Sequence, residues 1–137
     1  MLDAKGLAVK VKSDDGRWLV GVFLPEPGND SGFYIVPEGE EWRDGMPPLY
    51  QVRPDTVRRF TGCRDKDGHR IFEEDMIEYN NRGIYRARVK WDNGFWRLGW
   101  LPDENGKHVQ LRTDLLFWAA EREIGIVKTE KDKSGDV

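Results

Sequence analysis

An alternation of side chains between residues 84 and 100 constrains the fold of this chain more than any other feature. From Ile84 to Trp91, Tyr, Ala, Val and Trp alternate with a set that is mostly Arg and Lys, and a second alternating run follows from Phe95 to Trp100. The residues between them, Asp92-Asn93-Gly94, include an Asn-Gly pair, which is typical of a tight hairpin turn because both residues accept positive φ. A period of two gives each strand one apolar and one polar face. We therefore predict an antiparallel hairpin with an apolar inner face and a basic outer face.

Other short apolar or alternating runs extend this β pattern along the chain. They lie at residues 7–12, 18–24, 33–36, 49–52, 71–72, 76–79, 108–111 and 123–127. Only Thr113–Glu123 has helical spacing, with Thr113 as the expected N-cap and Asp114 near the positive end of the helix dipole. Many short strands with at most one short helix predict an all-β fold, with an N-terminal β-hairpin region.

The stretch from Glu38 to Pro48 is acidic and rich in Gly and Pro. This composition predicts a surface loop, and Trp42 is the side chain that we expect to anchor it.

Composition limits the class of protein. The chain has 137 residues, of which 38% are hydrophobic, and this is enough for one domain with a core that needs no disulfide or metal. Its single cysteine, Cys63, cannot form an internal disulfide. No apolar run approaches the ~18 residues of a membrane span. We therefore expect a cytoplasmic protein that has no membrane partner.

The charge is unevenly distributed. The net charge is −3, but residues 53–90 carry a surplus of +3, whereas residues 1–52 and 91–137 are negative. The basic strand face of Arg86, Arg88 and Lys90, with Arg58 and Arg59 nearby in sequence, is the best candidate for nucleic-acid binding, because alternate strand residues lie about 7 Å apart, near the phosphate spacing. The alternative is an ordinary solvated strand face, on which Glu78 and Asp92 pair with these cations.

Two catalytic arrangements are weaker alternatives. The carboxylates between Asp65 and Asp75 could hold a divalent cation, but their spacing does not match a calcium loop, and the turn at Asp65 and Asp67 explains them more simply. Cys63 and His69 could form a nucleophile pair, but no third group is indicated to orient them. We therefore predict a protein that is not an enzyme, with no cofactor, no metal and no small-molecule substrate.

The stretch Val52–Ile77, VRPDTVRRFTGCRDKDGHRIFEEDMI, resembles the YopX family of bacteriophage and prophage proteins. The strand Gly16–Gly21 and the residues Glu123–Gly125 add supporting similarity. Among the residues that match the family pattern are Pro54, Thr56, Thr61, Gly62, Asp65, Lys66, Gly68, Ile71, Glu73 and Asp75.

Three positions depart from that pattern. Glu74 replaces a Gly, Cys63 replaces a usual Leu and is expected to be a core substitution, and Ile126 stands where Asn normally follows the Gly. If the family Gly has positive φ, Glu74 is strained in that conformation or the local backbone differs.

The resemblance implies a mostly β fold with a small SH3-like barrel in the C-terminal part. We expect residues 1–52 to form an N-terminal β extension packed on the barrel, residues 53–127 to form the barrel region with the family signature, and residues 128–137 to be a flexible tail. The resemblance implies no reaction. The expected role is that of a phage or prophage accessory protein in the cytoplasm of its bacterial host, where it binds a protein partner or self-associates as an oligomer.

Overall fold

The computed structural model describes residues 8–127, which form two compact units. Unit 1 comprises residues 8–60 and unit 2 comprises residues 61–127. The expected boundary after Val52 lies inside unit 1, because the strand that follows it begins by pairing with the first strand of that unit. The expected flexible tail, residues 128–137, lies outside the described residues.

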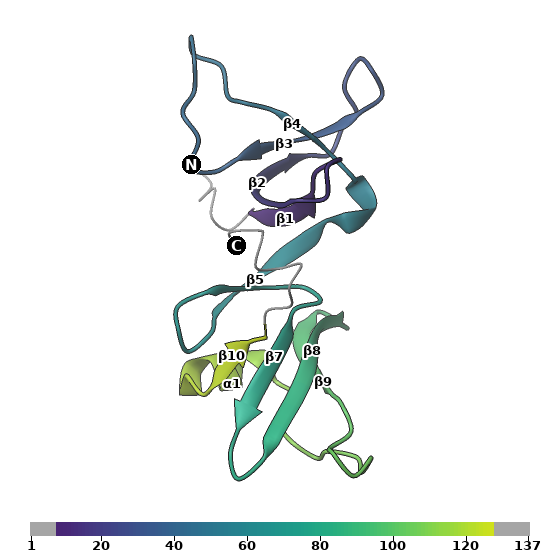
Figure 1. Cartoon of the computed structure of the whole chain (residues 1–137), viewed down its shortest axis with the longest axis vertical. Coiled ribbons are helices and arrows are strands. Elements are labelled where there is room, and N and C mark those ends of the chain that lie inside the picture. The colour runs from purple at the N-terminus through teal and green to yellow at the C-terminus, as the bar shows by residue number, and fades with distance from the viewer. Residues whose placement is uncertain (1–7, 128–137) are drawn as a thin grey trace. The chain divides into compact units, whose positions relative to one another are not determined.

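Unit 1 is built from antiparallel strands in the order β4-β3-β2-β1 (Figure 1). The end of β1 also meets β4, because Ser13 bridges Val52 and the backbone N–H of Arg53 donates to Lys12 O at 2.8 Å. Val11, Ile35 and Val52 form the core of the unit. The elements are β1 (Val9–Lys12), β2 (Trp18–Leu24), β3 (Phe33–Pro37), β4 (Tyr50–Val52), the 3-10 helix η2 (Pro54–Thr56) and the start of β5 (Arg58–Arg64).

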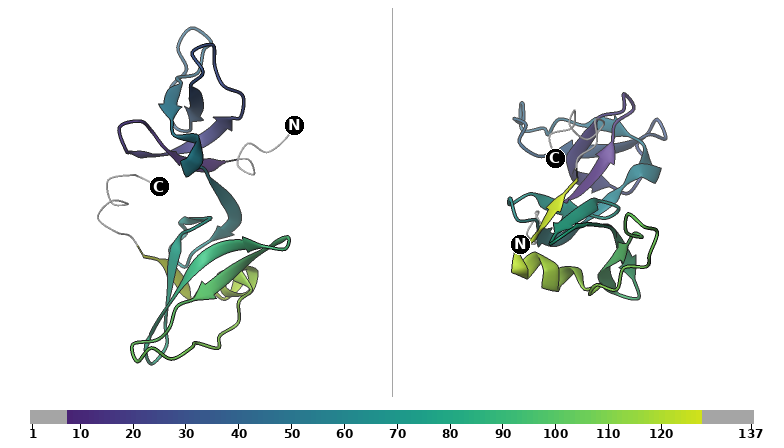
Figure 2. Two further views of the ribbon diagram at one scale, coloured as in Figure 1. Left: turned by 90° about the vertical axis from the view of Figure 1, so that its right-hand side faces the viewer. Right: turned by 60° about the horizontal axis from the view of Figure 1, so that its bottom comes forward.

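Unit 2 contains a second antiparallel sheet, in the order β10-β7-β8-β9, with a short helix against its inner face (Figures 1 and 2). The core contains Leu115 and Trp118 of this helix together with side chains of all four strands, including Ile77, Val89 and Leu98. The elements are β6 (Arg70–Phe72), β7 (Met76–Asn80), β8 (Ile84–Asp92), β9 (Phe95–Trp100), α1 (Leu115–Glu121) and β10 (Ile124–Ile126).

The prediction of a mostly β fold with one short helix is confirmed. The hairpin of β8 and β9 forms as expected, with Trp91 opposite Trp96 and with Asn93 and Gly94 at φ of 50° and 88°. The N-terminal hairpin of β1 and β2 also forms. The finer expectation of an SH3-like barrel within residues 53–127 stays a prediction.

Two local predictions were wrong, and one strand was not predicted at all. Arg58–Arg64 is a strand that the sequence did not reveal, because its polar side chains show no apolar alternation. His108–Leu111 is not a strand, although Val109 is buried between two exposed neighbours. The N-cap of α1 is Asp114 rather than Thr113, because the Asp114 carboxylate accepts the backbone N–H of Leu116.

No helix within residues 8–127 is both long enough and apolar enough to cross a membrane.

Candidate functional site

Three of the five predicted nucleic-acid-binding cations lie together on the outer face of the sheet in unit 2. Arg86, Arg88 and Lys90 alternate along β8 with the buried residues Ala87 and Val89, so the alternation predicted their common face correctly. Their side chains therefore point away from the core that α1 covers.

Acidic neighbours engage these cations. Arg86 Nε lies 3.0 Å from Glu78 Oε2, and Lys90 Nζ lies 2.7 Å from Glu74 Oε1. Arg88 donates from Nη1 to the backbone carbonyl of Glu74 at 2.8 Å. Glu78 was an expected partner, whereas Glu74 was not, and Asp92 lies 3.4 Å from Arg97 instead. A phosphate would have to compete with these carboxylates for the cations, and this competition lowers the binding free energy gained from each phosphate contact.

The other two candidate cations belong to unit 1. Arg58 and Arg59 begin β5, where they are the strand partners of Lys10 and Val9. Arg58 Nη1 lies 3.4 Å from the carbonyl of Val57. The five predicted cations are thus divided between the two units.

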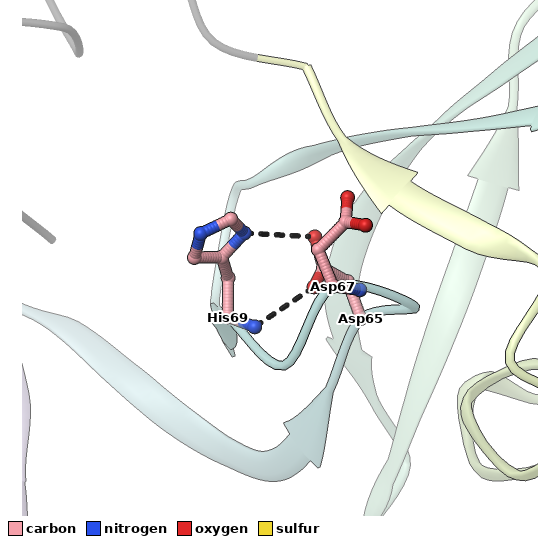
Figure 3. Close-up of side chains that lie close together, drawn as sticks. All are labelled: Asp65, Asp67 and His69. Atoms are coloured by element: carbon pink, nitrogen blue, oxygen red, sulfur yellow. Dashed lines mark hydrogen bonds and ion pairs between the residues drawn. The ribbon is translucent and has the colours of Figure 1, made fainter.

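The family signature contains a buried carboxylate at Asp65. Figure 3 shows this side chain beside Asp67 and His69. Its Oδ1 accepts the backbone N–H groups of Asp67 at 2.9 Å and His69 at 2.8 Å, and its Oδ2 accepts the backbone N–H of Ile126 at 3.0 Å. Burial alone would raise the pKa of Asp65, but the three backbone donors outweigh it and hold the pKa below the ordinary value of 3.8. Asp65 therefore stabilises the turn, and it also binds β10 through the backbone N–H of Ile126.

Asp65, Asp67 and His69 are close enough in space to be compared with a metal site, since their candidate ligand atoms lie within 4.8 Å of one another. However, both oxygens of Asp65 already accept backbone N–H groups, and His69 Nδ1 lies 3.5 Å from Asp65 Oδ2. Within residues 8–127, the carboxylates of Glu73, Glu74 and Asp75 do not join this group. The observed contacts are those of a structural turn.

Other signature residues also organise the backbone. Thr61 donates its hydroxyl to Ile71 O at 2.7 Å and accepts the N–H of Cys63 at 3.1 Å. Asp75 is buried and accepts the N–H of Phe72 at 2.8 Å. The hydroxyl of Thr56 accepts the N–H of Lys12 at 2.8 Å.

The remaining signature positions serve turns, the core or an edge. Gly62 and Gly68 have φ of 83° and 85°, a region that favours glycine. Pro54 begins η2, Ile71 is buried in the core, the backbone N–H of Lys66 donates to Ile124 O, and Glu73 is half-buried. The contacts of the signature thus explain the fold of this region without invoking a reaction.

Glu74 has the conformation expected of the family glycine, with φ of 71°. A residue with a side chain is strained in this conformation. Two contacts accompany this conformation: the Glu74 N–H donates to Val89 O at 2.8 Å, and its carboxylate pairs with Lys90.

Cys63 is half-buried and packs against the core of unit 2. Its replacement of a family Leu stays an expectation. Burial and the negative charge of Asp114 raise the pKa of its thiol, against an opposing hydrogen bond from Thr61. A raised pKa favours the neutral thiol, which is a poor nucleophile.

The loop between β3 and β4 exposes large apolar side chains, which the sequence interpretation missed. Trp42 is 61% exposed, so the prediction that it anchors the loop was wrong. Met46 and Leu49 are 64% and 48% exposed. The loop is held instead by paired hydrogen bonds between Arg43 and Met46 and by Tyr50, whose hydroxyl donates to Glu40 at 2.9 Å. It extends beyond the strands of unit 1 (Figure 1).

A cavity of about 500 Å³ lies beside this loop, lined by Glu40, Glu41, Arg43, Met46, Pro47, Pro48 and Tyr50. The sequence signal that could have identified the surface is the coincidence of Trp, Met and Leu with a Pro-Pro pair in a segment too polar to form a strand.

Comparison with known proteins identifies one family. The model of the YopX protein family matches residues 29–125, which is more than half of the chain. No curated protein matches the chain, and no solved structure does so either. The match spans the signature turn at Asp65, strands β7 to β9, helix α1 and the start of β10, and the chain therefore belongs to the YopX family.

Proposed function

We propose that this YopX-family chain is a phage or prophage accessory protein in the bacterial cytoplasm that binds a protein partner, or a second copy of itself, and catalyses no reaction. The observation that carries the proposal is the exposure of Trp42, Met46 and Leu49 on one loop. Large apolar side chains that gather on a surface are a common mark of protein interfaces, and Trp is enriched among the residues that dominate binding energy.

The charge of the loop gives the expected partner a chemical character. Residues 38–49 hold four carboxylates and one arginine, around the three exposed apolar side chains. A complementary surface would be apolar at its centre and basic at its rim, because matched charges speed association and disfavour wrong partners.

The test compares the wild type with a Trp42→Ala/Met46→Ala double variant. Both side chains are exposed, so we expect the variant to fold normally. Light scattering across a concentration series reports self-association, and photo-cross-linking from the loop in bacterial cells identifies a bound partner. Leu116→Ala is the matched control, because Leu116 is 69% exposed but lies on α1.

We expect a dimer or a single cross-linked partner for the wild type and for Leu116→Ala, and neither for the double variant. A wild-type protein that stays monomeric at all concentrations and cross-links to nothing would refute the proposal.

Nucleic-acid binding is a second candidate, favoured by the common outer face of Arg86, Arg88 and Lys90. In a gel-shift series, binding through this face predicts affinity that falls steeply with salt. It also predicts tighter binding by Glu78→Gln, which releases Arg86 from its ion pair. Absence of binding at low salt by both proteins would exclude this candidate.

A further inference from the structure

A second cavity, of about 290 Å³, lies within unit 2 between the sheet and the segment that follows β9. Two tyrosines form its aromatic wall. Tyr79 of β7 and Tyr85 of β8 are direct cross-strand partners, and their ring centroids lie 6.3 Å apart with 29° between the ring planes. The two half-buried rings therefore offer adjacent aromatic surface to the cavity.

One of the two tyrosines also packs against a buried side chain of α1. The Tyr79 ring packs against Trp118 of α1 at a centroid distance of 4.6 Å. Trp118 is only 6% exposed, and its indole Nε1 donates to Arg112 O at 2.7 Å. A ligand would therefore meet a surface that is already formed, which reduces the entropy lost on binding.

The opposite wall is a segment whose backbone is also fixed. Asp103 accepts the N–H groups of Asn105 and Lys107, both at 2.9 Å, and this closes a turn. Val109 is buried and anchors the segment, and it lines the cavity together with its exposed neighbours His108 and Gln110.

The polar groups of the lining indicate the charge of a suitable ligand. The lining residues include no Lys or Arg, and Asp103 is the one carboxylate among them. A phosphate or carboxylate would find no Lys or Arg in this cavity and would meet the carboxylate of Asp103. Asn81 and Gln110 each offer both a donor and an acceptor, which suits a ligand edge that carries both.

We propose that this cavity binds the planar, uncharged ring of a nucleobase or a similar heterocycle. The ring lies against Tyr79 and Tyr85, and its edge bonds to the amides of Asn81 and Gln110. Stacking on aromatic side chains and bonding along a base edge are the two means by which proteins hold unpaired bases. The volume is near the lower end for small-molecule pockets, so it suits one ring system. This site is independent of the loop between β3 and β4.

The experiment is an NMR titration of the full chain with adenosine, cytidine, guanosine and uridine. We expect saturable shifts for at least one nucleoside, at Tyr79, Asn81, Tyr85 and Gln110. Gln110→Ala and Tyr85→Leu should each weaken binding by roughly tenfold. Tyr34→Leu removes a half-buried tyrosine from β3 and should leave the affinity unchanged. Gln110 is exposed, so its variant keeps the test valid even if Tyr85→Leu does not fold.

Further arms separate the ligand sources. A short single-stranded oligonucleotide that shifts the same residues and is weakened by Gln110→Ala supports a strand as the source of the base, whereas binding of nucleosides alone supports a free nucleoside. The proposal is overturned if no nucleoside shifts these residues at millimolar concentration. It is also overturned if tetramethylammonium binds there and the nucleosides do not, since the cavity would then be a cation cage.

Discussion

Glu74 has a backbone conformation that residues with a side chain rarely adopt, with φ of 71°. The left-handed region costs a non-glycine residue about 1 kcal/mol, and the partly exposed ion pair to Lys90 returns only a few tenths. We expect Glu74→Gly to exceed Glu74→Ala in free energy of unfolding by about 1 kcal/mol, because both lose the ion pair but only Gly relieves the strain. Urea denaturation measures the difference. Equal stability of the two variants would show that the backbone at this position is unstrained.

Asp65 should make stability sensitive to acid. Its lowered pKa means that its contribution is complete above the ordinary value of 3.8 and is lost as the pH falls through the lower pKa of the folded state. Asp65→Asn should cost about 1–3 kcal/mol at pH 7, because an amide cannot accept all three backbone N–H groups.

The measurement is the free energy of unfolding of the wild type and Asp65→Asn between pH 7 and pH 2. The difference in free energy of unfolding between the wild type and Asp65→Asn should become smaller below about pH 4. Asp67→Asn is the control, since Asp67 is exposed and contributes its backbone N–H rather than its carboxylate to the turn. A gap that is constant with pH would contradict the assigned role of the Asp65 charge.

At the scale of elements, helix α1 depends on its cap because it has only seven residues. Asp114→Ala removes the acceptor of the Leu116 N–H and should destabilise unit 2 by about 1 kcal/mol. Thr113→Ala should cost less, because the Thr113 hydroxyl accepts only a long hydrogen bond of 3.5 Å from Arg97 Nη1, and its backbone carbonyl, which accepts the N–H of Leu98, is kept in the variant. Thermal unfolding of both variants measures these losses of stability. A larger loss for Thr113→Ala would indicate that Thr113 is the N-cap of α1.

The elements also show which local signals were sufficient. The hairpin of β8 and β9 was predictable because alternation and an Asn-Gly turn act over adjacent residues. Strand β5 was not, because its residues show no apolar alternation, although it lies in the sheet between β1, some fifty residues earlier in the chain, and β6, which follows the turn at Asp65. The side chains of His108–Leu111 do alternate between exposed and more buried. The more buried ones pack on the core, but the segment is not a strand.

At the scale of the molecule, each unit has a core of its own. Ile35 is fully buried in unit 1 and Ile77 is fully buried in unit 2. We expect Ile35→Ala to speed amide hydrogen exchange mainly in β1–β4 and Ile77→Ala mainly in β7–β9, with a cost of about 2–5 kcal/mol each. Hydrogen exchange followed by NMR or mass spectrometry checks this. If each variant sped exchange equally throughout residues 8–127, the two units would unfold as one.

The sequence by itself determined the class of fold, the main hairpin, the common face of Arg86, Arg88 and Lys90, and membership of the YopX family, because alternation, turn chemistry and the signature are local patterns. Only the tertiary structure decided that Asp65 is a backbone acceptor, that Glu78 and Glu74 engage the basic face, and that Trp42 faces solvent. The third hydrogen bond of Asp65 comes from Ile126, far along the chain, the ion pairs depend on how neighbouring strands are paired, and the exposure of Trp42 depends on how much packing surrounds it. Tertiary context of this kind is not encoded in a local pattern.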